Sequence, residues 1–428
     1  MSFDPAALTN DQRLRILDGS LSVAAFGLKP QSLEELLGER EDDKLWRPRT
    51  DKLVDAIGIV LPLRFNQLTQ RIENEGRSVD GDFLSTLYLQ LAELHLLEVS
   101  KDRAADAATV VARRNAYHPV RDYLNGLDTA LRPEEWAKIA TMCLGTLCPW
   151  AQIHLQRQLI GLVARVIKPG CKLDTALVVH SPDQGIGKST MWEALGGEWF
   201  SDSLGDLHNL KDDILQLHSA WIHEWGEIDA VVGKRESETL KKFLSARKDD
   251  VRKPYGRGVE TLHRSCGIVG TTNRNDFIKD PTGNRRFPVI TVSQVNLDWI
   301  ENNRDAIWGS ALHAFHAGDP WHYTQAENAQ ISEHARLYAA TDPLLDAVET
   351  WAEDHPDITS VAVARVIFDI SRDRLGDQEL SRQVARRLGQ LGWQRSDVRA
   401  RGFLPDGSKH DKSTLWLRST APADQFNF

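Results

Sequence analysis

The stretch most able to do chemistry combines glycines, a lysine and hydroxyl residues: Gly185, Ile186, Gly187, Lys188, Ser189 and Thr190. Glycines let backbone N–H groups close around an anion, and a helix that starts there adds the positive end of its dipole. In such a loop Lys188 would reach the β- and γ-phosphates of a nucleotide, and the Ser189 hydroxyl would hold Mg²⁺. The run therefore predicts a site for ATP with Mg²⁺.

The elements on either side of this loop are those that a phosphate loop needs. Residues 176–179 form an apolar run without alternation, which is typical of a strand buried on both faces of a parallel sheet. The helical sequence MWEAL follows the loop. The usual motif starts with glycine, whereas Pro182 stands there, so we expect the front of the loop to differ in shape. The alternative is a chance Gly-Lys-Ser after an apolar run.

Two carboxylates follow the next apolar run, at residues 219–223. A strand end would place Glu224 beside the phosphate loop, where it could bind Mg²⁺, usually through water. Glu227 is the better candidate for the base that orients the attacking water. The alternative for both is a surface acid at a strand end.

A third buried strand is predicted over residues 265–273, and it ends in Asn273. This amide could bridge the attacking water and the γ-phosphate, although strands also end in Thr-Asn for turn reasons alone. Arg285 and Arg286 come next, just before a further predicted strand. The pair could supply an arginine finger to a neighbouring subunit's ATP, or form a structural salt bridge.

Valines and a Tyr-Gly turn predict a basic hairpin over residues 250–265. Its Arg252, Lys253 and Arg257 are placed to grip a nucleic-acid strand by charge, with a solvated turn as the alternative.

Charge is separated along the chain, whose net charge is −9. Residues 380–420 carry nine Lys/Arg against three Asp, and the remaining residues sum to −15. This tail also shows a helix, a helix and two strands around residues 405–407, a winged helix-turn-helix pattern. The DNA-binding candidates there are Arg382, Arg386, Arg399 and Arg401.

The bulk composition is that of a soluble globular protein, with 41% hydrophobic and 26% charged residues. We see no apolar run near ~18 residues and no signal at the N-terminus, so we expect a cytoplasmic protein without membrane association. The four cysteines show no zinc spacing and are expected to be reduced.

Seven motifs follow one another in order: HPVRDYL at 118–124, PGCK at 169–172, QGIGKST at 184–190, WIHEWGE at 221–227, RKPYGRG at 252–258, GTTN at 270–273 and DPTGNRRF at 280–287. In this set the chain resembles the virulence-associated protein E family, whose members look like superfamily 3 helicases. The resemblance covers roughly residues 115–340. It implies an AAA+-like core and a homo-oligomeric ring, a hexamer, that translocates on single-stranded DNA. Many relatives are joined to a primase, and no such domain is evident here.

The predicted fold class is α/β: an AAA+-like (superfamily 3) P-loop core with a parallel sheet, a helical N-terminal region and a C-terminal winged-helix-like domain. The expected domains are a helical accessory domain at 1–115, a helical collar at 116–170, the ATPase core with a helical lid at 171–340, and the DNA-binding domain at 341–428.

The leading functional hypothesis is an ATP-dependent DNA helicase that serves replication of a phage, prophage or other mobile element. The alternative is an ATP-switched replication initiator or loader that binds duplex DNA without processive unwinding. A P-loop kinase for small molecules would fit the first motif, but it gives the basic hairpin and tail no role.

Overall fold

The structure is a computed structural model of the chain. In it the chain divides into two units, Met1–Ala339 and Ala340–Phe428. Each unit is described by itself, and the finer division with boundaries at 115, 170 and 340 stays a prediction. The residues that the structure describes are 32–41, 44–128, 134–146, 149–205, 207, 209–234, 237–251, 258–278, 284–338, 357–359, 388–389, 393–400 and 413–418.

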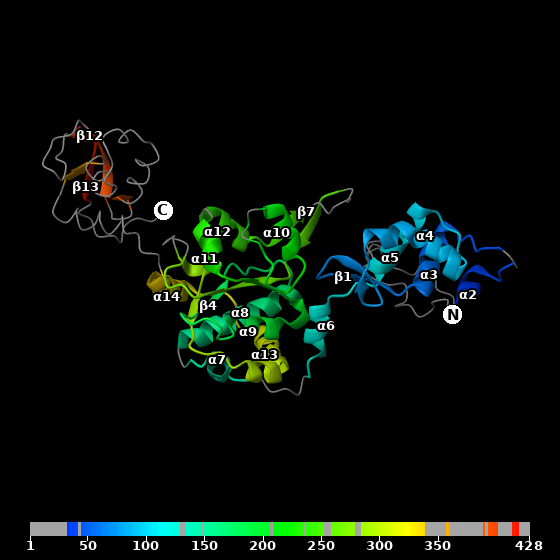
Figure 1. The fold of residues 1–428 in the computed structure, drawn as a ribbon, viewed down its shortest axis with the longest axis horizontal. Coiled ribbons are helices and arrows are strands. Elements are labelled where there is room, and N and C mark those ends of the chain that lie inside the picture. The colour runs from blue at the N-terminus through cyan, green and yellow to red at the C-terminus, as the bar shows by residue number, and fades with distance from the viewer. Residues whose placement is uncertain are drawn as a thin grey trace. The chain divides into compact units, whose positions relative to one another are not determined.

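The first unit is built around a five-stranded sheet in the order β10-β4-β9-β6-β5, and all neighbouring strands are parallel (Figure 1). The mixed α/β fold class with a central parallel sheet, predicted from the sequence, is confirmed. The strands are β4 (Leu177–His180), β5 (Phe200–Ser201), β6 (Ile222–Trp225), β9 (Gly267–Thr272) and β10 (Val289–Thr291).

Both faces of this sheet are covered, which explains why its strands are apolar without alternation. Every residue of β4, β6 and β9 is buried. In β4, Leu177 and Val179 belong to one hydrophobic cluster, whereas Val178 belongs to another on the opposite face. The sheet is therefore the middle layer of three.

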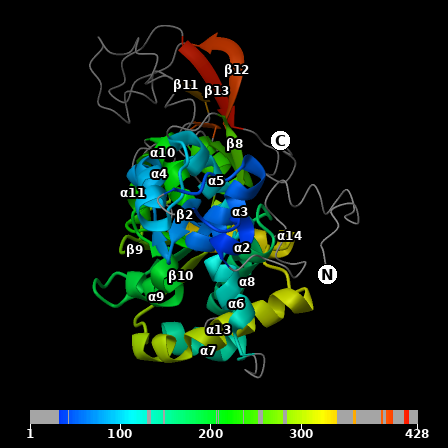
Figure 2. The ribbon, with the colours of Figure 1, turned by 90° about the vertical axis from the view of Figure 1, so that its right-hand side faces the viewer.

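Helices form the two outer layers, and Figure 1 shows them on opposite sides of the strands. One face packs against α7 (Trp136–Leu144), α8 (Pro149–Ile167), α9 (Lys188–Gly196) and α13 (Leu297–Ala317). Figure 2 shows α13 running along the core beside α7 and α8. The other face packs against α10 (Leu210–Leu217), α11 (Ile228–Lys234), α12 (Ser237–Ser245) and the end of α14 (Gln325–Ala335).

Helix α13 fixes the C-terminal end of α9, the helix that follows the phosphate loop. Trp308 Nε1 donates to the carbonyl of Leu195 at 3.0 Å, and Arg304 donates to the carbonyls of Leu195 and Gly196. An arginine at the last carbonyls of a helix also complements its dipole. Helix α13, the first part of the predicted helical segment at 297–340, thus holds the C-terminal end of α9 in place.

The N-terminal part of the first unit is mostly helical, as the sequence predicted, but it also contains a small sheet that was not predicted. Residues 63–78 form a three-stranded antiparallel sheet in the order β1-β2-β3. The strands hold two to four residues each, too short for a clear alternation beside the long leucine repeat of the following helix. The elements here are α2 (Leu33–Leu37), α3 (Thr50–Val60), β1 (Leu63–Asn66), β2 (Arg71–Asn74), β3 (Arg77–Ser78), α4 (Gly81–His95), α5 (Lys101–Arg114) and α6 (Pro119–Gly126).

The second unit contains an antiparallel sheet in the order β11-β13-β12. Strands β12 (Trp393–Ala400) and β13 (Ser413–Arg418) pair on either side of the predicted turn at 405–407, and β11 (Asp357–Thr359) adds to β13. Of the two predicted winged-helix helices, only 388–389 lies among the described residues, and it is helical.

Within the described parts of the chain, no helix combines the length and the apolar character that a membrane crossing requires.

Candidate nucleotide-binding site

The glycine-rich loop joins the end of β4 to the start of α9, as the sequence predicted. Gly185 and Gly187 have φ angles of +74° and +91°, a left-handed backbone that favours glycine. Gly187 is the N-cap residue of α9 and carries no side chain, so the first N–H groups of the helix can bind an anion. Ile186 is half-buried against the helical core, and Thr190 is exposed in the first turn.

Lys188 lies under this loop with only 7% of its surface exposed. Its Nζ donates to the backbone carbonyl of Asp183 at 3.0 Å. Burial lowers the pKa of Lys188, and the nearby negative charges of Asp183 and Glu224 oppose that shift. The ammonium group is thus held inside the loop, where a phosphate would meet it.

Glu224 ends next to the phosphate loop because β4, β6 and β9 are parallel and their carboxyl ends share one edge of the sheet. Its Oε1 accepts hydrogen bonds from Ser189 Oγ at 2.6 Å and from Thr271 Oγ1 at 2.5 Å. The structure therefore brings together both predicted metal ligands. Thr271 was not singled out in the sequence, although it lies in the GTTN motif.

The second carboxylate oxygen of Glu224, Oε2, is the atom best placed to bind a cation. The residue is 1% exposed, and among the described residues its Oε2 is buried without a hydrogen-bond partner. Burial raises the pKa of the Glu224 carboxyl, while the hydrogen bonds from Ser189 and Thr271 lower it. A carboxylate oxygen and a hydroxyl suit Mg²⁺, which keeps several waters and needs few protein ligands. The described residues contain no cluster of three or more His, Cys, Asp or Glu that could hold a metal.

Glu227 lies in the turn between β6 and α11, exposed, with a φ of +53°. A left-handed glutamate is strained, and such strain concentrates at functional sites. Two residues on, Asp229 accepts a hydrogen bond from Thr272 Oγ1 at 3.1 Å. Asp229 thus connects α11 to the end of β9. It was not among the predicted site residues, and only its position after the WIHEWGE motif could have marked it as one.

Asn273 also reaches the phosphate loop. Its Nδ2 donates to the carbonyls of Ser181 and Asp183, at 2.8 and 2.7 Å. This proximity follows from the register, in which Thr272 is the partner of His180.

A cavity of about 330 Å³ opens against the front of the loop. It is lined by Ser181, Pro182 and Asp183, by residues 144–146 and by residues 291–293. It lies outside the carboxyl ends of β4 and β10. The chain leaves β4 toward one edge of the sheet and returns to its other side with β10, so this is the switch point where α/β sheets bind ligands.

Arg285 and Arg286 are not part of this pocket. They lie in the short helix η4 (Asn284–Arg286) just before β10, at the amino-terminal edge of the sheet. A four-residue strand spans about 13 Å, so in this structure the pair is remote from the chain's own phosphate loop. Arg285 is exposed, and Arg286 is half-buried and donates to Ser245 Oγ at 3.3 Å. With Lys172 and Trp321, both arginines line a second cavity of about 290 Å³.

The predicted basic hairpin is present as β7 (Lys248–Val251) and β8 (Glu260–His263), which pair antiparallel. Its candidate DNA-binding residues Arg252, Lys253 and Arg257 lie outside the described residues.

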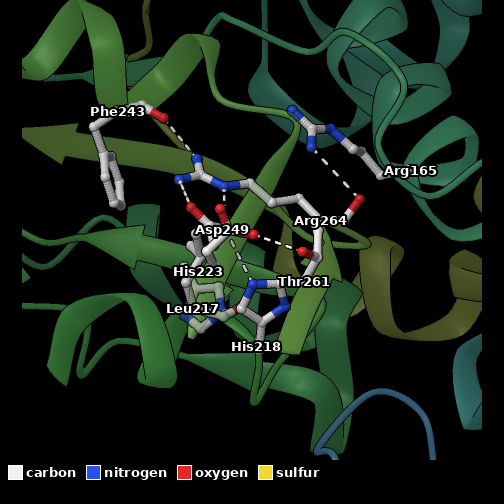
Figure 3. Close-up of polar contacts among 9 residues, drawn as sticks. Arg165, Leu217, His218, His223, Phe243, Asp249, Thr261 and Arg264 are labelled. Atoms are coloured by element: carbon white, nitrogen blue, oxygen red, sulfur yellow. Dashed lines mark hydrogen bonds and ion pairs between the residues drawn. The ribbon is translucent and has the colours of Figure 1, made fainter. Parts of the chain in front are cut away.

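The base of the hairpin is held by a buried ion pair (Figure 3). Arg264 donates to both carboxylate oxygens of Asp249, at 2.7 and 2.8 Å, and to the carbonyl of Phe243 at 2.6 Å. His218 Nε2 lies 3.1 Å from the same carboxylate. This cluster could not be predicted from the sequence, because its members come from three separate elements.

The other DNA-binding candidates belong to the second unit. Arg382, Arg386 and Arg401 lie outside the described residues. Arg399 belongs to β12, where its backbone pairs with Thr414, and its side chain is not described.

Several solved structures resemble the chain at low identity. The apo structure of the NrS-1 C-terminal region (305–718) is 12% identical, with a TM-score of 0.49, and the match covers 89% of this chain and all of that one. The X-ray structure of JCV helicase is 11% identical over 59% of this chain and 79% of that one, with a TM-score of 0.25. The structure named "SCCmec type IV Cch - active helicase" is 10% identical over 74% and 66%, with a TM-score of 0.29.

The sequence itself matches no curated protein. It does match the family model of the virulence-associated protein E-like domain, over residues 127–340, half of the chain. That span holds the phosphate loop, both acids, the hairpin and the arginine pair. The resemblance found in the ordered motifs is therefore confirmed, and the chain belongs to the virulence-associated protein E-like domain family.

Proposed function

We propose that this protein is an ATP-dependent DNA helicase that works as a ring, in replication of a phage, prophage or other mobile element. ATP, with Mg²⁺, would bind at the loop between β4 and α9. The observation that carries the proposal is the contact of Ser189 Oγ with Glu224 Oε1, beside a carboxylate oxygen that is buried without a partner. A hydroxyl and a carboxylate in contact under a glycine-rich loop suit a magnesium–triphosphate complex.

In this proposal, different residues bind the phosphates, hold the metal ion and activate the attacking water. Lys188 and the N–H groups of the loop bind the phosphates, and the front cavity accommodates part of the nucleoside. Bound Mg²⁺, held by Ser189 and Glu224, would neutralise charge on the phosphates. Glu227 orients a water molecule and accepts its proton as the water oxygen bonds to the γ-phosphorus and the bond to ADP breaks. The products are ADP, phosphate and a proton.

Hydrolysis would need a second copy of the chain. Arg285 and Arg286 lie at the edge of the sheet opposite to the loop, and Arg285 is exposed. An arginine finger stabilises the charge of the transferring phosphoryl group, and it can be supplied by a neighbour. This placement supports a ring, for which we propose six subunits on the basis of the family resemblance.

Coupling to DNA would pass through the hairpin β7–β8. Its root is fixed to the core by the pair of Asp249 and Arg264. Two residues separate Arg264 from the start of β9, and at the far end of this strand Thr271 and, just beyond the strand, Asn273 lie beside the loop. Basic residues at the hairpin tip and in the C-terminal unit would contact DNA phosphates.

A forked DNA duplex with a fluorescent strand tests the proposal. Strand separation should occur with ATP, fail with a non-hydrolysable ATP analogue, and fail with Glu227→Gln. Binding of the fork without strand separation, at the same salt, would instead favour an initiator or loader. Transfer of phosphate to a small molecule rather than to water would contradict both.

A further inference from the structure

The side-chain amide of Asn273 donates hydrogen bonds to both carbonyl groups that flank Pro182. Its Nδ2 donates to the carbonyl of Ser181 at 2.8 Å and to that of Asp183 at 2.7 Å. Ser181 is buried and also accepts, through its Oγ, the N–H of Asp183 at 3.2 Å. The proline is thus enclosed between hydrogen-bonded neighbours on both sides.

These two hydrogen bonds determine the direction in which the backbone carbonyls around Pro182 point. A loop that binds phosphate must turn its N–H groups inward, so the carbonyls of the same loop have to point elsewhere and find donors. Glycine usually occupies the first position of the loop, where Pro182 stands here and offers no N–H. A side-chain amide that holds the carbonyls before and after the proline keeps both away from the phosphate.

The chemistry of the amide limits what else Asn273 can do. A side-chain NH₂ group has two hydrogens, and both are directed at these carbonyls. The opposite orientation would place Oδ1 against two carbonyl oxygens, which is repulsive. In this arrangement Asn273 has no hydrogen left to donate to a γ-phosphate, the role expected from its position in the sequence.

Lys188 connects the hydrogen bonds of Asn273 to nucleotide binding, because it shares one of their acceptors. Its Nζ donates to the same carbonyl of Asp183 at 3.0 Å. When a phosphate draws the ammonium group to itself, the Asp183 carbonyl loses one donor and keeps the other. Asn273 therefore holds the loop in shape both before and after nucleotide binding.

We infer that Asn273 is a positioning residue of the phosphate loop, which preserves the anion-binding conformation around Pro182 for ADP and ATP alike. The inference rests on the proposed nucleotide site and deepens it. A residue that senses the γ-phosphate would matter only for ATP. A residue that shapes the loop matters equally for a nucleotide that lacks this group.

Calorimetric titration with Mg-ADP separates the two roles. Loss of two hydrogen bonds of ordinary strength predicts that Asn273→Ala weakens ADP binding by about tenfold, and Asn273→Asp by at least as much, because a carboxylate repels both carbonyls. Binding of a non-hydrolysable ATP analogue should weaken by the same factor as binding of ADP, because the loop shape serves both nucleotides. Asn302→Ala is the matched control, because this exposed amide on α13 also donates to a carbonyl, that of Asp298.

Unchanged ADP affinity in Asn273→Ala, with a large fall in kcat, would overturn the inference and restore the γ-phosphate role. Thermal unfolding of each variant excludes misfolding as the cause, and Asn273→Asp keeps the side-chain size where alanine disturbs the fold. Failure of the unchanged protein to bind ADP at all would contradict the proposed nucleotide site itself, which is a separate outcome.

Discussion

Ser189 Oγ donates to Glu224 Oε1 at 2.6 Å, which joins the first turn of α9 to the end of β6. The two residues proposed to hold Mg²⁺ are therefore in direct contact. Their hydrogen bond keeps both side chains beside the phosphate loop, at the place proposed for the cation.

The ionisation of Glu224 gives a prediction for stability. Because burial raises the pKa of this carboxyl above 4.5, its value in the unfolded chain, the native state holds the proton more tightly. Without Mg²⁺, the free energy of unfolding relative to Glu224→Gln should fall as the pH rises above about 4.5, because the unfolded chain then loses this proton more readily than the native state does. Denaturant titrations along this pH series measure the difference. Parallel curves for the two proteins would mean that the carboxyl is not perturbed.

Magnesium should act on the same residue. In thermal unfolding at neutral pH with ADP present, Mg²⁺ should raise the Tm of the unchanged protein more than that of Glu224→Gln, because the glutamine amide is uncharged and offers the cation no anionic oxygen. An equal rise in both proteins would remove Glu224 from the metal site.

The two loop glycines should differ in their tolerance of a methyl group. Both have positive φ, which costs alanine about 1 kcal/mol. A Cβ at Gly185 meets nothing within 4 Å, whereas one at Gly187 lies 3.2 Å from the Leu297 side chain. We expect Gly185→Ala to lose about 1 kcal/mol of stability and Gly187→Ala about 2–4 kcal/mol, measured by denaturant unfolding.

A double-mutant cycle with Leu297→Ala isolates the clash at Gly187. The Gly187→Ala substitution should cost less in the Leu297→Ala background than alone, because the contact is removed. Equal costs in both backgrounds would show that backbone strain is the whole effect.

The ion pair at the hairpin root should be essential for stability. Burial of Asp249 would raise its pKa, but hydrogen bonds from Arg264 and His218 lower it from 3.8 to about 2. Asp249→Asn should cost about 3–5 kcal/mol, because Arg264 would remain buried without its counter-charge. Asp250→Asn is the control. This neighbour in β7 is exposed and accepts a hydrogen bond from the exposed Thr261, so we expect a change within about 0.5 kcal/mol.

The pH dependence of that pair has the opposite sign to that of Glu224. A depressed pKa contributes stability above about pH 3.8, which is lost as the pH falls toward about 2. Acid unfolding of Asp249→Asn should lack this part of the transition. An Asp249→Asn protein as stable as the unchanged one would refute the anchoring role.

The arginine pair predicts complementation between subunits. Arg285→Ala should lower kcat for ATP by at least about 100-fold with ADP affinity unchanged, since an arginine finger acts on the transition state. Mixing Arg285→Ala with Lys188→Ala should restore part of the activity, because one kind of interface then combines an intact loop with an intact arginine. Arg286→Ala should have a smaller effect on kcat, as this side chain is tied to Ser245.

Absence of complementation in mixed rings of confirmed assembly would contradict a finger supplied by a neighbour. Loss of ADP affinity in Arg285→Ala would point instead to a role in the fold.

The sequence predicted the core well because its signals are local. The unalternating apolar run before Gly185 identified a buried parallel strand, and the strand ends at Glu224 and Asn273 meet at one edge by the geometry of parallel sheets. These elements follow in order along the chain, so the site could be assembled from neighbouring motifs. The short strands at 63–78 were missed because too few residues alternate to reveal a period of two.

The contacts that depend on tertiary structure could not be predicted. The meeting of His218, Asp249 and Arg264 needs the packed positions of α10, β7 and the segment after β8. The two carbonyl partners of Asn273 depend on the register between β4 and β9. Neither relation leaves a periodic or spaced pattern in the amino-acid sequence.

The rate of ATP hydrolysis by the unchanged protein and by Lys188→Ala, each measured with and without single-stranded DNA, decides whether the protein is a DNA-dependent ATPase. We expect DNA to increase hydrolysis severalfold in the unchanged protein, and we expect no hydrolysis above background in Lys188→Ala under either condition. Hydrolysis that ignores DNA, or that survives the loss of Lys188, would contradict this expectation.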